Sequence, residues 1–206
     1  MTAGRATTQG GGEDTINAFH DALFARHGHS RSSLGWHSQE WQQARFQAVL
    51  SLAPFTGWSV LDIGCGFGDL ADVLHAKAPD ASYTGYDINA NFVETCRARR
   101  PGATFERRNI LTDPPKRPFH AVVSVGPINI DIGDNEAVMR ELIRAMFKSC
   151  RHYCAMSMAS RKGHRHAPGY HYYDPVEMLA FCNGLCDRVA LRHDYLTSDF
   201  CVYLLK

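Results

Sequence analysis

From Gly57 to the C-terminus, short apolar runs alternate with stretches in which apolar residues recur at helical spacing. This alternation is typical of a mostly parallel sheet whose strands are joined by crossover helices. The link between the last two strands is only residues 195–198, so those strands can pair antiparallel. The pattern predicts a doubly wound α/β fold with strands at 59–63, 83–87, 104–107, 119–125, 152–158, 188–194 and 199–205, and helices at 69–77, 90–99, 134–149 and 174–183.

Two further helices are expected before the first strand. Apolar residues from Ile16 to Phe24 follow helical spacing, and Gly28 is placed to end that helix. A second helix should begin after a cap at Ser38 and end before Pro54, because the residue before a proline disfavours the helical conformation. The sheet does not need these helices for its own closure, so we expect them to cover its open edge.

The chain of 206 residues fits one domain with one core. Residues 1–13 are rich in Gly, Thr and Ala and have almost nothing to bury, which predicts a disordered tail. Residues 14–206 should form a single domain, with a helical lid at 14–52 and a Rossmann-like core at 57–206.

Charge and hydropathy narrow the range of partners. The 22 Lys and Arg balance 21 Asp and Glu, so no overall field attracts nucleic acid or an anionic membrane. No apolar run approaches the ~20 residues that span a bilayer, and the N-terminus lacks the apolar segment of a secretory signal. We expect a cytoplasmic monomer or homodimer that binds neither nucleic acid nor membrane.

Seven cysteines, an odd number, are scattered through predicted strands and helices. This distribution is typical of reduced thiols rather than of a disulfide framework. Cys150 and Cys154, and likewise Cys182 and Cys186, are i, i+4 pairs, whereas zinc ligands in turns more often have two residues between them. We therefore expect no metal site.

The strongest chemical signal follows the first predicted strand. A turn that contains Gly64, Gly66 and Gly68 separates the strand at 59–63 from a helix, and glycine allows the backbone to approach a ligand closely. Nineteen residues after Gly68, the second strand ends in Asp87. An acid at that place can accept hydrogen bonds from both hydroxyls of a ribose. Together these features predict a nucleoside site.

A dinucleotide site has similar parts, so two cofactors have to be compared. The place of the third glycine in a dinucleotide fingerprint is occupied by Asp69, and a carboxylate in the first helical turn would repel a pyrophosphate seated there. S-adenosylmethionine has no phosphate and carries a sulfonium cation, which tolerates Asp69. The residues favour S-adenosylmethionine, and an NAD-dependent oxidoreductase is the alternative.

Residues 57–126 resemble class I S-adenosylmethionine-dependent methyltransferases. The segment 61–68 is similar to that family's glycine-rich first motif, and 86–88 resembles the second, whose acid holds the ribose. Asn109 and Ile110 fall where the family commonly has an acid and an apolar residue that contact adenine, and the Asn oxygen could still accept from the adenine amino group. The resemblance implies cofactor contacts for Asp62, Gly64, Cys65, Gly66, Gly68, Asp87, Ile88, Asn109 and Ile110, and, from a segment similar to the fourth motif, Ser124 and Gly126.

The resemblance also implies a seven-stranded sheet of order 3-2-1-4-5-7-6 with strand 7 antiparallel. The cofactor would then lie across the carboxyl ends of strands 1 to 4. In the lid, Arg45 could pair with the methionyl carboxylate in fork geometry, or it could simply extend to solvent from an amphipathic helix.

The residues that would bind the methyl acceptor are sought after the fifth strand. The loop at 160–173 should overhang the methyl group and contains His164, His166 and His171 as candidate catalytic bases. With neighbouring tyrosines these side chains could bind an anionic or aromatic molecule; the alternative is a solvated basic loop.

The small size and the absence of an added recognition domain favour a small methyl acceptor. We therefore expect a methyltransferase that acts on an unidentified small molecule, such as an intermediate of a biosynthetic or secondary-metabolite pathway. A protein that binds S-adenosylmethionine without catalysis is the remaining alternative.

Overall fold

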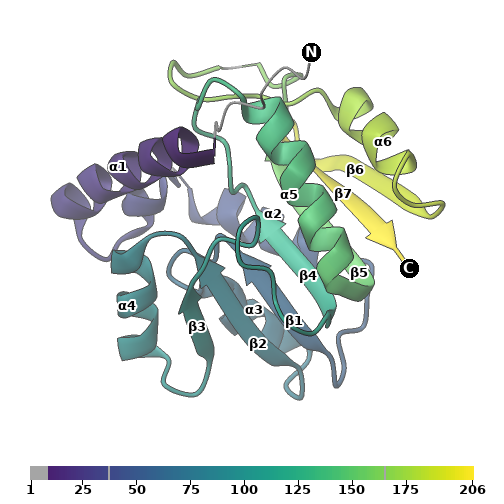
Figure 1. Cartoon of the computed structure of the whole chain (residues 1–206), viewed down its shortest axis with the longest axis horizontal. Helices are drawn as coiled ribbons and strands as arrows, with labels where there is room; N and C mark the ends of the chain where they lie inside the picture. Colours follow the sequence, from purple (N-terminus) through teal and green to yellow (C-terminus); the bar gives the residue numbers. More distant parts are fainter. Residues whose placement is uncertain (1–8, 37, 165) are drawn as a thin grey trace, which may run out of the picture.

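The computed structural model describes residues 9–36, 38–164 and 166–206. Its seven strands form one sheet in the order β3-β2-β1-β4-β5-β7-β6 (Figure 1). The pairs from β3 to β5 are parallel, whereas β7 is antiparallel to both β5 and β6. The predicted fold class and strand order are confirmed. The strands are β1 (Ser59–Ile63), β2 (Ser82–Asp87), β3 (Thr104–Arg107), β4 (Phe119–Val125), β5 (Cys150–Ala159), β6 (Val189–Leu196) and β7 (Asp199–Leu205).

Helices precede the strands and connect them. They are α1 (Gln9–His27), the 3-10 helix η1 (Arg31–Leu34), α2 (Gln39–Val49), α3 (Asp69–Lys77), α4 (Ala90–Arg99), α5 (Asn135–Ser149) and α6 (Pro175–Asn183). Apolar residues of α2 and α3 are buried against one face of the sheet, and those of α5 and α6 against the other. This doubly wound layering leaves the carboxyl ends of the parallel strands along one edge.

Alternate residues of the central strands serve the two layers. In β4, Val122 joins the cluster under α5, whereas Ala121 and Val123 join the cluster under α2 and α3. Side chains of a strand point to opposite faces with a period of two, so a strand covered on both sides needs apolar residues at nearly every position. The near-continuous apolar runs of the sequence therefore mark these strands.

The N-terminal region differs from its prediction. α1 begins at Gln9, so the prediction of a tail is wrong for residues 9–13, and the remainder of that tail, 1–8, lies outside the described residues. Three glycines in this stretch disfavour a helix in isolation. Tertiary contacts offset that cost, since Glu13 accepts a hydrogen bond from Asn109 in the core.

Two predicted helix starts are confirmed by their caps. Ser38 Oγ accepts from the Trp41 backbone N–H at 3.3 Å, and Asp174 Oδ1 accepts from the Val176 N–H at 2.8 Å, with Pro175 in the first turn. Each cap satisfies a backbone donor that the helix itself cannot pair. The 3-10 helix η1 was not predicted, because four residues are too few to show a periodicity.

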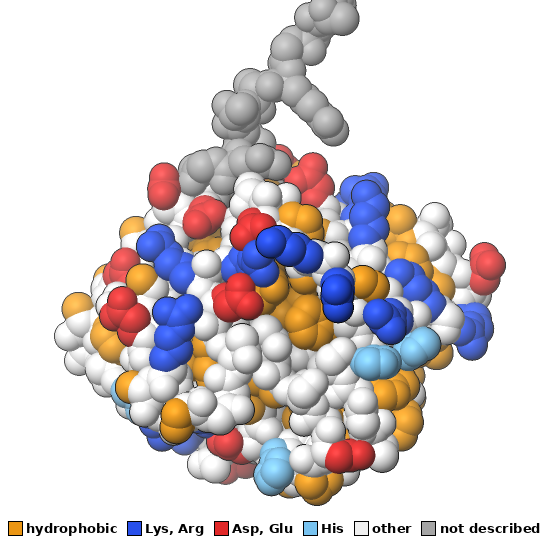
Figure 2. Space-filling model, turned by 60° about the horizontal axis from the view of Figure 1, so that its bottom comes forward, with side chains coloured by type: hydrophobic (Ala, Val, Ile, Leu, Met, Phe, Trp, Pro, Cys, Tyr) orange, Lys and Arg blue, Asp and Glu red, His pale blue; other side chains and the backbone are white. Residues whose placement is uncertain are grey.

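The surface and the thiols have no special organisation in the described part of the chain. All seven cysteines are free. The described residues include no group of three or more His, Cys, Asp or Glu that could hold a metal ion. Equally, no described helix combines the length and the apolar character that crossing a membrane requires. On the face shown in Figure 2, acidic and basic side chains lie next to one another.

Candidate functional site

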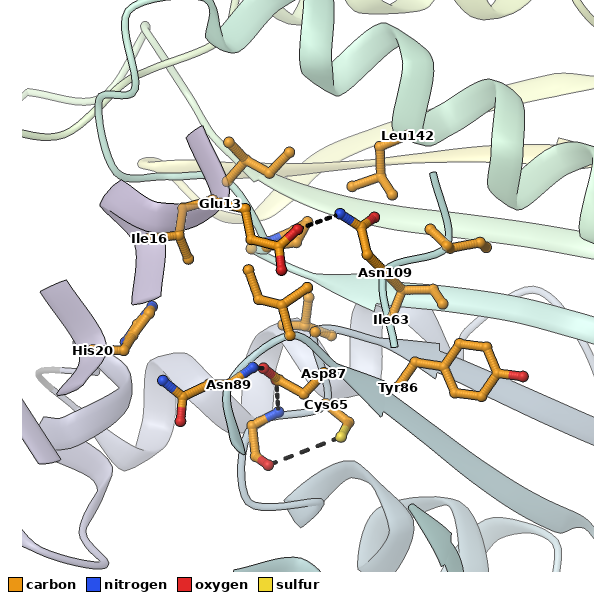
Figure 3. A pocket seen from close by; sticks show the side chains of 18 of the residues that line it. Glu13, Ile16, His20, Ile63, Cys65, Tyr86, Asp87, Asn89, Asn109 and Leu142 are labelled. Atoms are coloured by element: carbon orange, nitrogen blue, oxygen red, sulfur yellow. Dashed lines mark hydrogen bonds between the residues drawn. The ribbon is translucent and has the colours of Figure 1, made fainter. Parts of the chain in front are cut away.

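A cavity of about 220 Å³ opens at the carboxyl ends of the parallel strands, the edge at which open α/β sheets bind their ligands. We call its two walls the sheet side and the helical side (Figure 3). The sheet side consists of the turns after β1, β2, β3 and β4 and includes Asp62, Ile63, Gly64, Cys65, Gly66, Asp87, Ile88, Asn109, Ile110 and Gly126. The helical side consists of α1, η1 and the residues around them, together with residues of α2 and α5, and includes Gly12, Glu13, Ile16, His20, Leu34 and Trp36.

Backbone conformation shapes the turn after β1. Gly64 (φ 70°) and Gly66 (φ 54°) are left-handed, a conformation that other residues rarely adopt. The N–H groups of Gly64 and Cys65 donate to the Tyr86 carbonyl at 2.8 and 3.1 Å, which ties the turn to β2. A Cβ on Gly66 would lie 2.8 Å from Leu34. The bare backbone at Gly66 therefore allows Leu34 of η1 to pack directly against the turn.

Asp87, at the end of β2, is fixed by backbone donors. It is buried and accepts from the N–H of Gly66 at 2.8 Å and of Asn89 at 2.9 Å (Figure 3). Burial raises the pKa of this carboxyl to about 6. Each of its oxygens accepts one of these bonds, and a carboxylate offers about four acceptor sites. Acceptor capacity therefore remains for a ligand in the cavity.

Asp62, in β1, is a second buried carboxylate on the sheet side. Tyr83 Oη donates to its Oδ2 at 2.7 Å. Burial raises the pKa of Asp62 to about 7, and the negative charges of Asp87 and Asp69 contribute in the same direction. A cationic group bound nearby would favour the ionised form of these carboxylates.

Asn109 lies directly after β3 and faces α1. Its Oδ1 accepts from the Leu111 backbone N–H at 2.9 Å, and its Nδ2 donates to Glu13 Oε2 at 2.8 Å (Figure 3). The amide oxygen that was expected to meet adenine is thus directed at the backbone. The group that Asn109 presents toward α1 is its nitrogen.

The helical side lies across the strand ends. A Cβ on Gly126, the residue after β4, would lie 3.6 Å from the Trp36 ring. In Figure 3, Ile16 and His20 of α1 stand on the opposite side of the cavity from Asp87. Residues from the predicted lid region therefore form one wall of the same cavity as the glycine turn.

His20 is a cavity residue that sequence reasoning missed. Its Nδ1 lies 3.1 Å from the Ser33 carbonyl oxygen, and its ring packs edge-on against Phe19 and Phe92. Burial lowers the pKa of His20, which favours the neutral ring near pH 7. Because a carbonyl oxygen only accepts, the neutral ring carries its proton on Nδ1 and keeps Nε2 as an acceptor. Its sequence signal is a histidine four residues after Ile16 on an apolar helix face.

Gly68 and Ser124 were predicted to bind the cofactor, but they do not line the cavity. Gly68 (φ 71°) precedes α3, where a Cβ would lie 2.7 Å from Phe105, so its bare backbone allows the helix to pack. Ser124 Oγ donates to the Ile63 carbonyl at 2.6 Å within the sheet. Both residues support the turn after β1 from behind.

Arg45 does not line the cavity either. Its Nε donates to Asp199 Oδ2 at 2.7 Å, and its guanidinium lies 4.7 Å from the centre of the Trp36 ring. Both members of this ion pair are buried. The prediction of a bond to the methionyl carboxylate is therefore corrected to a pair that joins α2 to β7, because Arg45 finds its acid 154 residues later in the chain.

The three histidines proposed as bases also lie outside the cavity. His164 and His166 are exposed, and His166 stacks on Tyr172 with 4.3 Å between ring centres. His171 Nε2 lies 3.4 Å from Glu136 Oε1, a residue of α5. Among the residues that the structure describes, the histidine that lines the cavity is His20.

Comparisons with known proteins bear on the same region. A family model described as a methyltransferase domain matches residues 60–148. The Mycobacterium tuberculosis protein Rv1506c, whose name assigns it to the methyltransferases, is 27% identical over 161 residues, which cover 72% of this chain and 93% of that protein. Trans-aconitate 2-methyltransferase of Methylobacterium nodulans is 34% identical over 59 residues, 29% of this chain. The chain spans only 23% of the length of that second relative.

Solved structures share the fold. Magnesium protoporphyrin IX methyltransferase from Synechocystis, with bound S-adenosylmethionine, has a TM-score of 0.65 at 11% identity and covers 99% of this chain and 100% of that one. The DhpI complex with S-adenosylhomocysteine has a TM-score of 0.70 at 11% identity and covers 96% and 97%. In the match of residues 60–148 to the family model, in its sheet order and in the glycine turn at the strand ends, the chain is similar to class I S-adenosylmethionine-dependent methyltransferases.

Proposed function

We propose that the protein transfers the methyl group of S-adenosylmethionine to a small molecule held in the cavity. One observation carries the proposal: the glycine turn, Asp87 and residues of α1 and η1 line a single space at the strand ends. Methyl transfer is an in-line displacement, so a site that aligns donor and acceptor can supply on the order of 7–11 kcal/mol of the barrier.

The sheet side fits this cofactor. Gly64 and Gly66 line the cavity with bare, left-handed backbone, and Asp87 keeps acceptor sites for two ribose hydroxyls. Asp62 offers a buried carboxylate to the methionyl ammonium group. When bound, the cofactor supplies a methyl group activated by its sulfonium. NAD fits less well, because Asp69 lines the cavity at the first turn of α3, where it would repel a pyrophosphate.

The helical side favours an apolar or aromatic acceptor without a negative charge. Trp36 and Ile16 line it, and Ile128 extends this apolar surface. Among the described lining residues, Arg108 is the one Lys or Arg, and its Nε is already paired with Asp113 at 2.6 Å. Solved neighbours named for magnesium protoporphyrin IX and for pyocyanin biosynthesis also carry the names of small molecules, which supports a small acceptor here.

A hydroxyl acceptor would need a base, and His20 is placed to be that base. Its Nδ1 proton is held by the Ser33 carbonyl, so Nε2 can take the hydroxyl proton as the acceptor oxygen bonds to the methyl carbon. The resulting imidazolium returns its proton to water after the product leaves. An amine acceptor that arrives deprotonated would not need this step.

The test is incubation of the protein with isotopically labelled S-adenosylmethionine and a metabolite extract, followed by mass spectrometry of the molecules that acquire the label. The expected result is a labelled small molecule and its absence when the protein is omitted. Binding of S-adenosylmethionine without any labelled product would indicate a binding protein. Binding of NAD in place of S-adenosylmethionine would indicate an oxidoreductase.

A further inference from the structure

The hydrogen bond between Glu13 and Asn109 joins the two sides of the cavity. It links residues 96 positions apart, one from α1 and one from the turn after β3, at 2.8 Å (Figure 3). Both residues line the cavity and are half-buried. A ligand bound between α1 and β3 therefore meets this pair as a unit.

The orientation of the Asn109 amide is set by the backbone. The Leu111 N–H donates to Asn109 Oδ1 at 2.9 Å, and rotating the amide would place its NH₂ group against that donor. The nitrogen must therefore be the atom that faces Glu13. Asn109 can donate into the cavity but has its oxygen engaged elsewhere, so it is poorly suited to receive an amino group.

The missing acceptor is available from Glu13. Asn109 Nδ2 donates to one of its oxygens, Oε2, and an ionised carboxylate accepts several hydrogen bonds. The edge of an adenine presents an amino donor beside a ring-nitrogen acceptor. Glu13 as acceptor and the second Nδ2 hydrogen of Asn109 as donor complement that edge.

We propose that Glu13, from the N-terminal helix, recognises the adenine amino group of the cofactor together with Asn109. This inference rests on the proposed function and deepens it. Since Glu13 belongs to α1, cofactor binding also holds the helical side against the strand ends. Cofactor affinity then depends on the helix that carries His20.

The test measures binding of S-adenosylhomocysteine and of S-inosylhomocysteine, in which an oxygen replaces the amino group, by calorimetry. Wild-type protein should bind the adenosyl compound about ten- to a hundredfold more tightly, the usual effect of a hydrogen bond to a charged group. Glu13→Ala should lose most of this preference. Asp14→Ala, which removes the exposed carboxylate next to Glu13 on α1 and lies outside the cavity lining, is the matched control and should keep it.

Exchanging the acid and the amide between positions 13 and 109 supplies an independent readout. Asn109→Asp should weaken binding of S-adenosylhomocysteine by about tenfold, because it places two carboxylates in contact. Adding Glu13→Gln to that variant should restore affinity, since the amide then donates to the acid. Circular dichroism establishes that each variant is folded.

The outcomes separate the two proposals. If wild-type protein binds neither compound, the proposed function and the role of Glu13 both fail. If wild-type protein binds S-adenosylhomocysteine but Glu13→Ala keeps the full preference, or Asn109→Asp alone binds as well as wild type, only the role of Glu13 is overturned.

Discussion

The sheet side and the helical side of the cavity are built in different ways. On the sheet side, left-handed glycines form the turn after β1, and two backbone N–H groups fix Asp87. On the helical side, side chains of α1 and η1 reach the cavity because packing brings them across the strand ends. The first arrangement is encoded in a few consecutive residues, whereas the second depends on contacts between distant segments.

The two sides also offer different chemistry. Carboxylates and bare backbone on the sheet side suit the cofactor, while the apolar wall and His20 on the helical side suit the acceptor. Substitutions on the sheet side should therefore change cofactor affinity, and those on the helical side should change turnover. Glu13 would be the exception that connects them.

The largest effect is expected at His20. His20→Gln keeps a polar side chain but removes the base, so with a hydroxyl acceptor kcat should fall by about 10²- to 10⁴-fold while the affinity for S-adenosylhomocysteine is retained. Because burial lowers the pKa of His20, wild-type turnover should be constant above about pH 6.5 and fall only in more acidic solution. Steady-state assays across this range measure both effects.

His166→Gln is the control for that experiment, because His166 is exposed and does not line the cavity. It should keep the wild-type kcat. Full turnover in His20→Gln combined with a loss in His166→Gln would return the catalytic role to the loop at 160–173.

The second prediction separates packing from binding at Arg45. Arg45→Ala removes the cation that pairs with the buried Asp199 and leaves this carboxylate the hydrogen bond from Tyr195 Oη, which should lower the free energy of unfolding by about 3 kcal/mol. Urea denaturation measures this loss. The folded variant should bind S-adenosylmethionine normally, and Arg45→Ala/Asp199→Ala should recover part of the stability. Wild-type stability with greatly weakened cofactor binding would instead support a bond to the methionyl carboxylate.

The same contrast explains what the sequence could and could not predict. The strands that end at Ile63 and Asp87 were placed correctly, because local hydrophobic patterning and glycine spacing determine them. The ion pair of Arg45 with Asp199 was not predicted and His20 was missed, since these side chains contact Asp199 and the Ser33 carbonyl, which no local pattern reveals.

The loop at 160–173 is the opposite case, in which residue types suggested a site that the tertiary contacts do not support. Its histidines and tyrosines are chemically suited to a site, and its place after the fifth strand pointed to the cavity. Whether such a loop reaches a site depends on what holds it, and here His171 lies beside Glu136 of α5. Residue type predicts possible chemistry, but tertiary contacts decide where that chemistry is located.

The third prediction concerns Asp87 on the sheet side. Asp87→Ala removes the proposed ribose acceptors and should weaken binding of S-adenosylhomocysteine by about ten- to a hundredfold in calorimetry. Asp87→Asn keeps one acceptor oxygen and should lose less. Asp80→Ala, at an exposed position in the turn before β2, should bind as wild type. Unchanged affinity in Asp87→Ala would place the ribose elsewhere.

The smallest expected effect is on the pH dependence of stability. The free energy of unfolding should change in opposite directions with pH for a titrating residue on the sheet side and one on the helical side. Burial raises the pKa of Asp62 to about 7, so the folded state holds a proton that the unfolded state, with a pKa near 3.9, has released. By linkage, this group stabilises the fold at low pH, and its contribution is lost as pH rises through about 7. For His20, burial lowers the pKa, so the folded state binds fewer protons and its contribution increases as pH rises through about 6.5.

Urea unfolding at about pH 6 and about pH 7.5 measures both contributions by difference. Relative to Asp62→Asn, which cannot titrate, wild-type protein should lose about 1 kcal/mol of stability between these two values. Relative to His20→Gln, it should gain stability over the same interval. Differences of the same sign in the two comparisons would mean that one of these side chains is not buried as the cavity requires, and a pH-independent difference for Asp62→Asn would remove the buried proton from the sheet side.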